Sequence, residues 1–326
     1  MGCVGIMART TLSVRHLGRH ISGSPARPSS LRWLLNRHNG RVQVSVRFAP
    51  LSVMTHNMGL LVAPGNYLGT DRSGSIDEIV ARISALQPDV VGLCEMFADG
   101  EREFVRSKLR LIYPHFSEGP DEFDLESDGG LLLLSRHPVL FARDIIYRDC
   151  DGSDCFANKG ILHMRIQPPA WPTPLDVFFT HMQNIATSDG TRALYAQLSH
   201  LQRFMDLHGS PGVPKMILGD LNIPAGEAHH YTEMINRLGG PRDCWTIAGN
   251  PVASGETFVR DNNFYEDSDD KPTRDERLDY VLLKAQHTAI PILSTIEILK
   301  FQRNGRLISD HFGLLARFEK VALIGR

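Results

Sequence analysis

Short apolar runs separated by polar turns recur from residue 51 almost to the end of the chain. Typical examples are Val90–Cys94, Leu131–Leu134 and Met216–Leu218. Each run is too short for a core helix and has the length of a strand buried on both faces. Helices are expected where apolar residues have helical spacing, in 75–86, 191–207 and 227–238. This alternation predicts an α/β chain, of the α+β kind, in which two packed sheets are flanked by helices.

Further strands are expected at similar apolar runs, in 51–55, 161–166, 177–180, 280–283 and 314–318. Ser75 and Glu78 have the spacing of a capping box, which predicts that the first helix begins at Ser75. The polar, acidic stretch from Asp261 to Arg277 is expected to form a surface loop. Trp171, in a proline-rich turn, is either exposed for contact with a membrane interface or packed against its prolines.

The first 50 residues differ from the rest in charge, because they contain eight arginines and no Asp, Glu or Lys. An arginine-rich, acid-free segment is typical of organellar targeting, so residues 1–49 are predicted to be a leader and 50–322 one catalytic domain. Lipidation at Gly2 or Cys3 and a basic tail without a targeting role are the alternatives. The leader favours an intracellular location, in a mitochondrion or another organelle. Alternating valines at 42, 44 and 46 predict a strand near its end.

Charge and cysteine content narrow the class of protein further. The whole chain has a formal net charge of −2, but the 27 basic residues outside the first 50 face 37 acidic ones, so residues 51–326 carry −10. No apolar run is long enough to span a bilayer. Cys150 and Cys155 are close enough in sequence to bridge in an oxidising compartment, but we expect free thiols, as in reducing compartments. No Cys/His spacing resembles a zinc site.

Polar side chains suited to metal and phosphate chemistry stand at the ends of these apolar strands. They are Asn57, Glu95, His181, Asp220, Asn222, Asp279, Asp310 and His311. Carboxylate and amide oxygens suit Mg²⁺ or Mn²⁺, and two histidines can serve as acid and base. Each residue alone is as consistent with a cap or a surface charge. Their shared position predicts one common site.

Three motifs identify a family resemblance. Residues 219–222 read Gly-Asp-Leu-Asn, 277–280 read Arg-Leu-Asp-Tyr, and 309–311 read Ser-Asp-His. In this order and spacing they resemble the endonuclease/exonuclease/phosphatase superfamily of metal-dependent phosphoesterases, over about residues 50–320. The resemblance implies a four-layer sandwich, with two central, mostly antiparallel sheets between helices and the site at one end of the sheets.

The resemblance also implies a metal centre and a reaction. Asn57 and Glu95 would hold Mg²⁺, with Mn²⁺ as a possible substitute, and Asp310 would be a further ligand. The reaction would be in-line attack of water at phosphorus, with the metal and histidines offsetting the developing charge.

The remaining site residues would act on the water and the phosphate. By resemblance, Asp220 and Asn222 would orient both. His311, oriented by Asp279, would act as general base or bind a phosphate oxygen. His181 would donate to a phosphate oxygen or protonate the leaving group.

Several segments resemble the neutral sphingomyelinase branch. They are Asp128–Pro138, Thr180–Gln183, the helical residues Arg192, Gln197 and Phe204, and Asp154–Gly160, which reads Asp-Cys-Phe-Ala-Asn-Lys-Gly. By resemblance, Lys159 would meet the substrate phosphate and Asp154 would position Lys159; a turn with a surface ion pair is the alternative. The branch implies a hydrolase of phospholipid head groups, acting on sphingomyelin or a related lipid through peripheral membrane contact.

Three other functions remain open. The first is a nuclease of the abasic-site or deadenylase type, which the −10 charge of residues 51–326 disfavours because phosphate contacts dominate nucleic-acid affinity. The second is a phosphatase of sugar or inositol phosphates. The third is a non-catalytic lipid-binding member of the family, which we would expect to have lost site residues that are present here.

Overall fold

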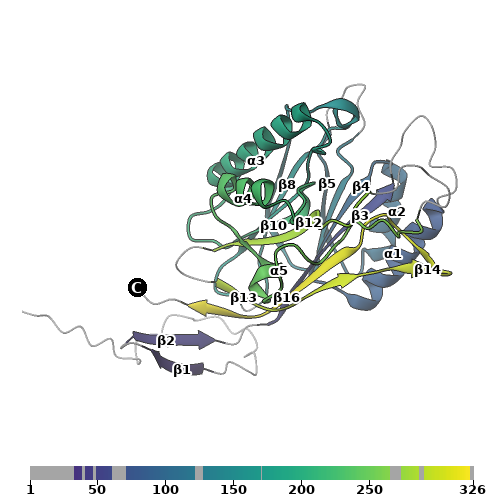
Figure 1. Ribbon diagram of the computed structural model, residues 1–326. Coiled ribbons are helices and arrows are strands. Elements are labelled where there is room, and N and C mark those ends of the chain that lie inside the picture. The colour runs from purple at the N-terminus through teal and green to yellow at the C-terminus, as the bar shows by residue number, and fades with distance from the viewer. Residues whose placement is uncertain are drawn as a thin grey trace, which may run out of the picture. The chain divides into compact units, whose positions relative to one another are not determined.

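The computed structural model describes residues 33–38, 41–46, 49–60, 71–121, 128–169, 171–264, 273–285 and 290–323. Two large sheets form its centre (Figure 1). The strands of the first are β1 (Trp33–His38), β2 (Arg41–Val46), β3 (Leu51–Leu60), β4 (Val90–Met96), β5 (His115–Gly119), β6 (Leu131–Ser135), β13 (Ile290–Leu299) and β16 (Gly313–Leu323). Their order is β1-β2-β16-β3-β4-β6-β5, with β13 also paired to β16.

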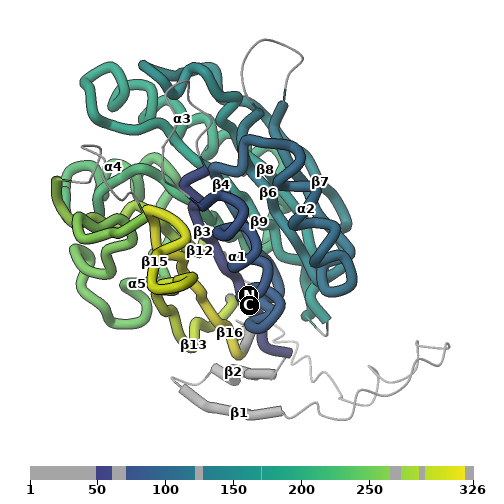
Figure 2. Tube along the Cα trace, turned by 90° about the vertical axis from the view of Figure 1, so that its right-hand side faces the viewer, coloured from purple at the N-terminus to yellow at the C-terminus, as the bar shows by residue number. Residues whose placement is uncertain are grey.

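The second sheet has the order β11-β12-β10-β9-β8-β7. Its strands are β7 (Val139–Ile146), β8 (Gly160–Ile166), β9 (Leu175–His181), β10 (Lys215–Asp220), β11 (Arg242–Asp243) and β12 (Asp279–Lys284). Of these strands, β7, β8, β9 and β12 are labelled in Figure 2. One pair in each sheet is parallel, β3 with β4 and β9 with β10, and the other pairs are antiparallel. The short strands β14 (Gln302–Arg303) and β15 (Arg306–Leu307) form a separate ribbon.

Helices cover the outer face of each sheet (Figure 1). Apolar side chains of α1 (Arg72–Leu86) and α2 (Asp99–Leu109) pack on the first sheet. Those of α3 (Ser188–His208) and α4 (Ala228–Arg237) pack on the second. The short helices η1 (Gly152–Phe156) and α5 (Cys244–Ile247) lie in connections. The expected four-layer sandwich with two mostly antiparallel central sheets is therefore confirmed.

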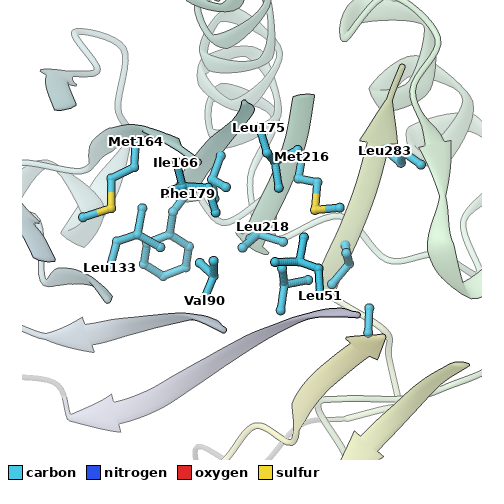
Figure 3. Packing of buried hydrophobic residues seen from close by; sticks show 14 of the residues in the cluster. Leu51, Val90, Leu133, Met164, Ile166, Leu175, Phe179, Met216, Leu218 and Leu283 are labelled. Carbon is cyan, nitrogen blue, oxygen red and sulfur yellow. The ribbon is translucent and has the colours of Figure 1, made fainter. Parts of the chain in front are cut away.

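The two sheets meet in an apolar core that Figure 3 shows from close by. Phe179 of β9 reaches across toward β4, near Val90 and Leu133. Gly92 makes room for its ring, since a Cβ at residue 92 would lie 2.5 Å from Cε2 of Phe179. The missing side chain at residue 92 thus allows the two sheets to approach closely at this point.

One local expectation is wrong, and one that was left open is decided. The first helix begins at Arg72 rather than Ser75, because the Asp71 side chain accepts a hydrogen bond from Gly74 N at 2.9 Å and caps the helix one turn earlier. Trp171 is not an exposed interface residue: only 5% of it is exposed, it packs in the core between the sheets, and its indole donates to Ala49 O at 3.1 Å.

The segment expected to be a surface loop is partly interior. Asn262 and Phe264 are buried, and 265–272 lie outside the described residues. In the predicted leader, residues 1–32 lie outside the described residues, whereas β2 confirms the strand expected around Val44. The division at residue 49 stays a prediction. No helix in the described ranges is long and apolar enough to cross a bilayer.

Removal of the Phe179 ring should be costly, because it leaves a cavity between two sheets that cannot close up. We expect Phe179→Ala to lower the free energy of unfolding by about 3–5 kcal/mol. The matched change Phe116→Ala, at a ring that is 46% exposed and lies beside Arg106, should cost less than about 1 kcal/mol. Urea denaturation measures both; equal losses would contradict the packing described here.

Candidate active site

Strand pairing brings the predicted site residues to one end of both sheets. Asp220, at the end of β10, stands directly opposite His181 of β9 and Asp279 of β12. In the first sheet, Asn57 of β3 is the register partner of Cys94, next to Glu95. Parallel neighbours end at the same edge, and antiparallel partners begin there. All eight polar residues named from the strand ends are at most 9% exposed.

The Asn57 amide joins two carboxylates from different sheets. Its Nδ2 donates to Glu95 Oε1 at 2.9 Å and to Asp220 Oδ2 at 3.0 Å, while its Oδ1 accepts from Gly59 N at 3.0 Å. The amide therefore presents its nitrogen to the two acids. Asp220 is held further by Asn222 N, which donates to Oδ1 at 2.8 Å.

Glu95 has an unusual backbone and an unusual charge state. Its φ of 57° is left-handed, a conformation that is uncommon for non-glycine residues and recurs at functional sites. Burial, followed by the charge of Asp310, raises the pKa of Glu95 to about 8. Its Oε2 is buried and has no hydrogen-bond partner among the described residues. An acid in this setting favours either a proton or a cation.

Two further carboxylates surround His311. Its Nδ1 lies 2.8 Å from Asp279 Oδ2, and its Nε2 lies 3.7 Å from Asp220 Oδ2. Burial alone would lower the pKa of His311, but the charges of Asp279 and Asp220 raise it well above the usual value. Burial also raises the pKa of Asp220 to about 6. His311 is thus arranged as a cation whose second ring nitrogen faces the cluster.

His181 has the opposite tendency. Its Nε2 lies 3.7 Å from both Glu95 Oε1 and Asp220 Oδ2, and 3.3 Å from Lys159 Nζ. Burial, together with the charges of Lys159 and His311, lowers the pKa of His181 well below the usual value. Two histidines in one site whose pKa values are driven apart are suited to different proton-transfer roles.

Lys159 enters the site with Asp154, as the sequence predicted. Lys159 Nζ lies 2.9 Å from Asp154 Oδ1 and donates to Met182 O at 3.0 Å. The same carbonyl accepts from Asn222 Nδ2 at 2.8 Å. Lys159 is only 6% exposed, so the pair is not a surface ion pair.

Cys150 and Cys155, on either side of Asp154, form a disulfide. The expectation that both are free thiols is therefore wrong. Their spacing of five residues is compatible with either state, so the sequence alone favoured the wrong one on the basis of compartment.

Sequence reasoning missed the residues that support the last motif. Asn262 Nδ2 donates to Ser309 O at 3.0 Å and to Asp310 O at 2.7 Å, and thereby fixes the turn before His311. Thr257 Oγ1 accepts from Asp279 N at 3.3 Å, and the Phe258 ring lies 4.8 Å from that of His311. Asn262 lies in a stretch whose polar composition indicated a loop, and no spacing connects it to the motif.

The side chains present fit a divalent cation. Ligand atoms of Glu95, His181 and Asp220 lie within 4.8 Å of one another, as do those of Asp220, Asp279 and His311. The unpartnered Glu95 Oε2 and the raised pKa values of Glu95 and Asp220 show that burial makes the ionised carboxylates costly, a cost that a bound cation would offset. Asp310 is close enough for its charge to act on Glu95. The predicted ligands Glu95 and Asp310 thus lie together, with His181 and Asp220 as further donors. Asn57, also predicted to be a ligand, lies beside them but turns its amide nitrogen, a hydrogen-bond donor, toward the acids.

Comparison with known proteins agrees with this arrangement. Residues 54–311 match the Endonuclease/Exonuclease/phosphatase family. The chain belongs to this family. Its members are phosphoester hydrolases, and every strand-end residue singled out above lies within or at the edge of the matched region.

Relatives by sequence include two lipid hydrolases. Sphingomyelinase C of Listeria ivanovii is 28% identical over 172 residues, which are 45% of this chain and 50% of that protein. Phospholipase C of Staphylococcus aureus is 23% identical over 269 residues, 73% of this chain and 74% of that protein. The chain thus spans about half the length of the Listeria relative.

Solved structures share the fold. Sphingomyelinase C from Streptomyces griseocarneus has a TM-score of 0.63 at 20% identity and covers 83% of this chain and 99% of that one. D. rerio TDP2 complexed with single-strand DNA product has a TM-score of 0.65 at 17% identity, over 83% and 100%. A Staphylococcus aureus beta toxin with bound magnesium ions has a TM-score of 0.60 at 18% identity, over 82% and 99%.

Glu95→Gln should show how far ionisation of the buried Glu95 carboxyl lowers the free energy of unfolding. The carboxyl of Glu95 is protonated in the folded protein and ionised in the unfolded chain between its ordinary pKa of 4.5 and about 8. The unfolded chain therefore holds fewer protons, so the free energy of unfolding falls as pH rises through this range. We expect the variant to lose less stability than the wild type over this range in the presence of a chelator, by on the order of 5 kcal/mol.

Urea denaturation at several pH values measures this difference, and added Mg²⁺ provides the control. Mg²⁺ should restore stability to the wild type at high pH and affect Glu95→Gln much less. Parallel pH profiles together with equal effects of Mg²⁺ would show that Glu95 is not part of a metal-binding cluster.

Proposed function

We propose that the protein is a Mg²⁺-dependent phosphodiesterase that hydrolyses the head-group phosphodiester of sphingomyelin or a related phospholipid. The observation that carries the lipid assignment is the buried Lys159 ammonium, held by Asp154 at 2.9 Å beside His181. This lysine and aspartate are the residues in which the sequence resembles sphingomyelinases. The similarity to sphingomyelinase C and phospholipase C supports the same assignment.

Mg²⁺ is proposed because of the side chains that could bind it and because a structure of the same fold contains magnesium. Glu95, with Asn57 and Asp310 beside it, would hold the ion, and His181 and Asp220 are within reach of the same space. A bound divalent cation would polarise a phosphoryl oxygen and offset the charge of the acids. The beta toxin of the same fold contains magnesium, and Mn²⁺ prefers similar oxygen ligands.

His311 and Lys159 are proposed to contact the substrate phosphate as positively charged groups. His311, whose pKa is raised by Asp279 and Asp220, is suited to donate from Nε2 to a phosphoryl oxygen that gains charge. Lys159 would contact a second phosphate oxygen as a fixed cation. Both groups are held before substrate arrives, so neither needs to reorganise during the reaction.

Asp220 and Asn222 are proposed to activate the attacking water. His181 is proposed to act on the leaving group. Asp220 Oδ2 faces both imidazoles at 3.7 Å and can accept a proton from a water between them. Asn222, fixed by Met182 O at 2.8 Å, would orient the water and the phosphate. His181 lies on the Lys159 side, where its ring, kept neutral by the lowered pKa, could stabilise the departing oxygen with a hydrogen bond.

A nuclease is the second candidate, because the TDP2 structure of the same fold holds a DNA product. The charge of −10 on residues 51–326 argues against it, since a nucleic-acid track needs net basic surface.

An assay of the purified chain on sphingomyelin micelles, abasic-site DNA and a small chromogenic phosphodiester separates the candidates. We expect Mg²⁺-dependent release of the sphingomyelin head group, with slow hydrolysis of the chromogenic diester and none of DNA. His311→Ala should lower turnover by about 10²–10⁴-fold. Preferential cleavage of DNA would overturn the lipid assignment and support the nuclease.

Lys159→Met removes the ammonium while preserving the length of the side chain. We expect hydrolysis of sphingomyelin to fall far more than hydrolysis of the chromogenic diester, because the ammonium meets the phosphate in the geometry set by a lipid head group. Lys215→Met, at the opposite end of β10, is the matched control and should change neither rate. Equal losses on the two substrates in the Lys159 variant would count against the sphingomyelinase-like branch.

A further inference from the structure

Residues 149–155, here named the clamp loop, precede Lys159 and are closed by the disulfide between Cys150 and Cys155. The closed ring contains Asp154, the carboxylate that holds the Lys159 ammonium. The ring is short and the aspartate is next to one of its cysteines, so movement of the ring moves the carboxylate. The position of Lys159 therefore depends on what holds the clamp loop.

Gln197 of α3 links the clamp loop to the chain that follows His181. Its Oε1 accepts from Gln183 N at 2.9 Å, and its Nε2 donates to Asp149 O at 2.8 Å. It is 1% exposed; its hydrogen bond with Gln183 is buried, and the one with Asp149 is partly buried. A buried amide that donates and accepts at once couples its two partners, and its loss leaves both unsatisfied.

A second set of hydrogen bonds holds the other side of the clamp loop. Asp151 N donates to Gln183 Oε1 at 2.8 Å, and Asp151 Oδ2 accepts from Thr187 Oγ1 at 2.6 Å. Asp154 Oδ2 accepts from Asn184 N at 2.8 Å. The clamp loop is thus tied at several points to residues 183–187, immediately after the catalytic strand end.

Packing alone does not hold the clamp loop. A cavity of about 130 Å³ lies against it, lined among others by Asp154, Lys159 and Gln197. Cys150 is exposed and Cys155 half-buried. With open space on one side and solvent on the other, the disulfide and the amide hydrogen bonds supply the restraint that side-chain packing supplies elsewhere.

We propose that Gln197 and the Cys150–Cys155 disulfide position Lys159: they keep the clamp loop closed so that the ammonium is presented to the substrate phosphate. The inference rests on the proposed function in that Lys159 contacts substrate. Opening of the clamp loop weakens substrate binding and leaves the carboxylates of Glu95 and Asp220 in place. A dithiol opens it by exchange, in which the dithiol becomes a disulfide and Cys150 and Cys155 gain two electrons and two protons as thiols.

Gln197→Met tests the amide link, with Gln202→Met on the same helix as the matched control. Gln202 accepts from Lys284 instead and lies away from the clamp loop. We expect Gln197→Met to raise KM for sphingomyelin about tenfold with little change in kcat, and Gln202→Met to change neither. In a Lys159→Met background, Gln197→Met should have no further effect. An equal effect in both backgrounds would mean that Gln197 acts on the fold and not through Lys159.

Amine labelling tests the clamp without any turnover. Lys159 should react slowly with an acylating reagent in the oxidised wild type, and several-fold faster after dithiol treatment, in Cys150→Ser/Cys155→Ser and in Gln197→Met. Peptide mass spectrometry reads the label, with Lys215 as internal reference. Unchanged labelling of Lys159 in all three overturns the clamp. If labelling rises as expected but the wild type hydrolyses no lipid, the proposed function fails and the clamp stands as a feature of the fold.

Discussion

The rest of the site depends on the contacts of one buried carboxylate, that of Asp220. It stands opposite His181 and Asp279 in its own sheet, and it shares the Asn57 amide with Glu95 of the other sheet. One acid thus connects its own strand with four others. Burial makes its ionised form costly, as the pKa of about 6 records, and the surrounding cations are arranged to offset that cost.

The fold brings the buried acids and the positively charged side chains together, so that the cost of burying the ionised acids is offset. The contact of Phe179 over Gly92 allows the sheets to approach closely, and the two parallel pairs bring strand ends from both sheets to one edge. At that edge, His311 supplies positive charge next to Asp279 and Asp220, and Lys159 supplies it next to His181. The buried Oε2 of Glu95 has no hydrogen-bond partner among the described residues, and burial raises the pKa of this acid. Both features suit Glu95 to bind a divalent cation.

The sequence predicted the strand ends and the residues that follow them, because a buried strand followed by a polar side chain is a local pattern. It did not predict features that depend on distant contacts. Asp71 rather than Ser75 caps the first helix, Trp171 is buried by packing, and Asn262 reaches the Ser309–Asp310 turn from a polar segment. The edge strands β7 and β13 carry mixed polar patterns and were not expected. The disulfide depended on redox state, which composition does not record.

Binding of a divalent cation between the two sheets is the central claim, and anomalous diffraction from crystals soaked in Mn²⁺ tests it most directly. Mn²⁺ scatters anomalously and accepts the same oxygen ligands as Mg²⁺. We expect an anomalous peak bounded by Glu95 and Asp220 and absent from crystals of Glu95→Gln. A peak elsewhere, or the same peak in the variant, would contradict a metal centre at the ends of β4 and β10.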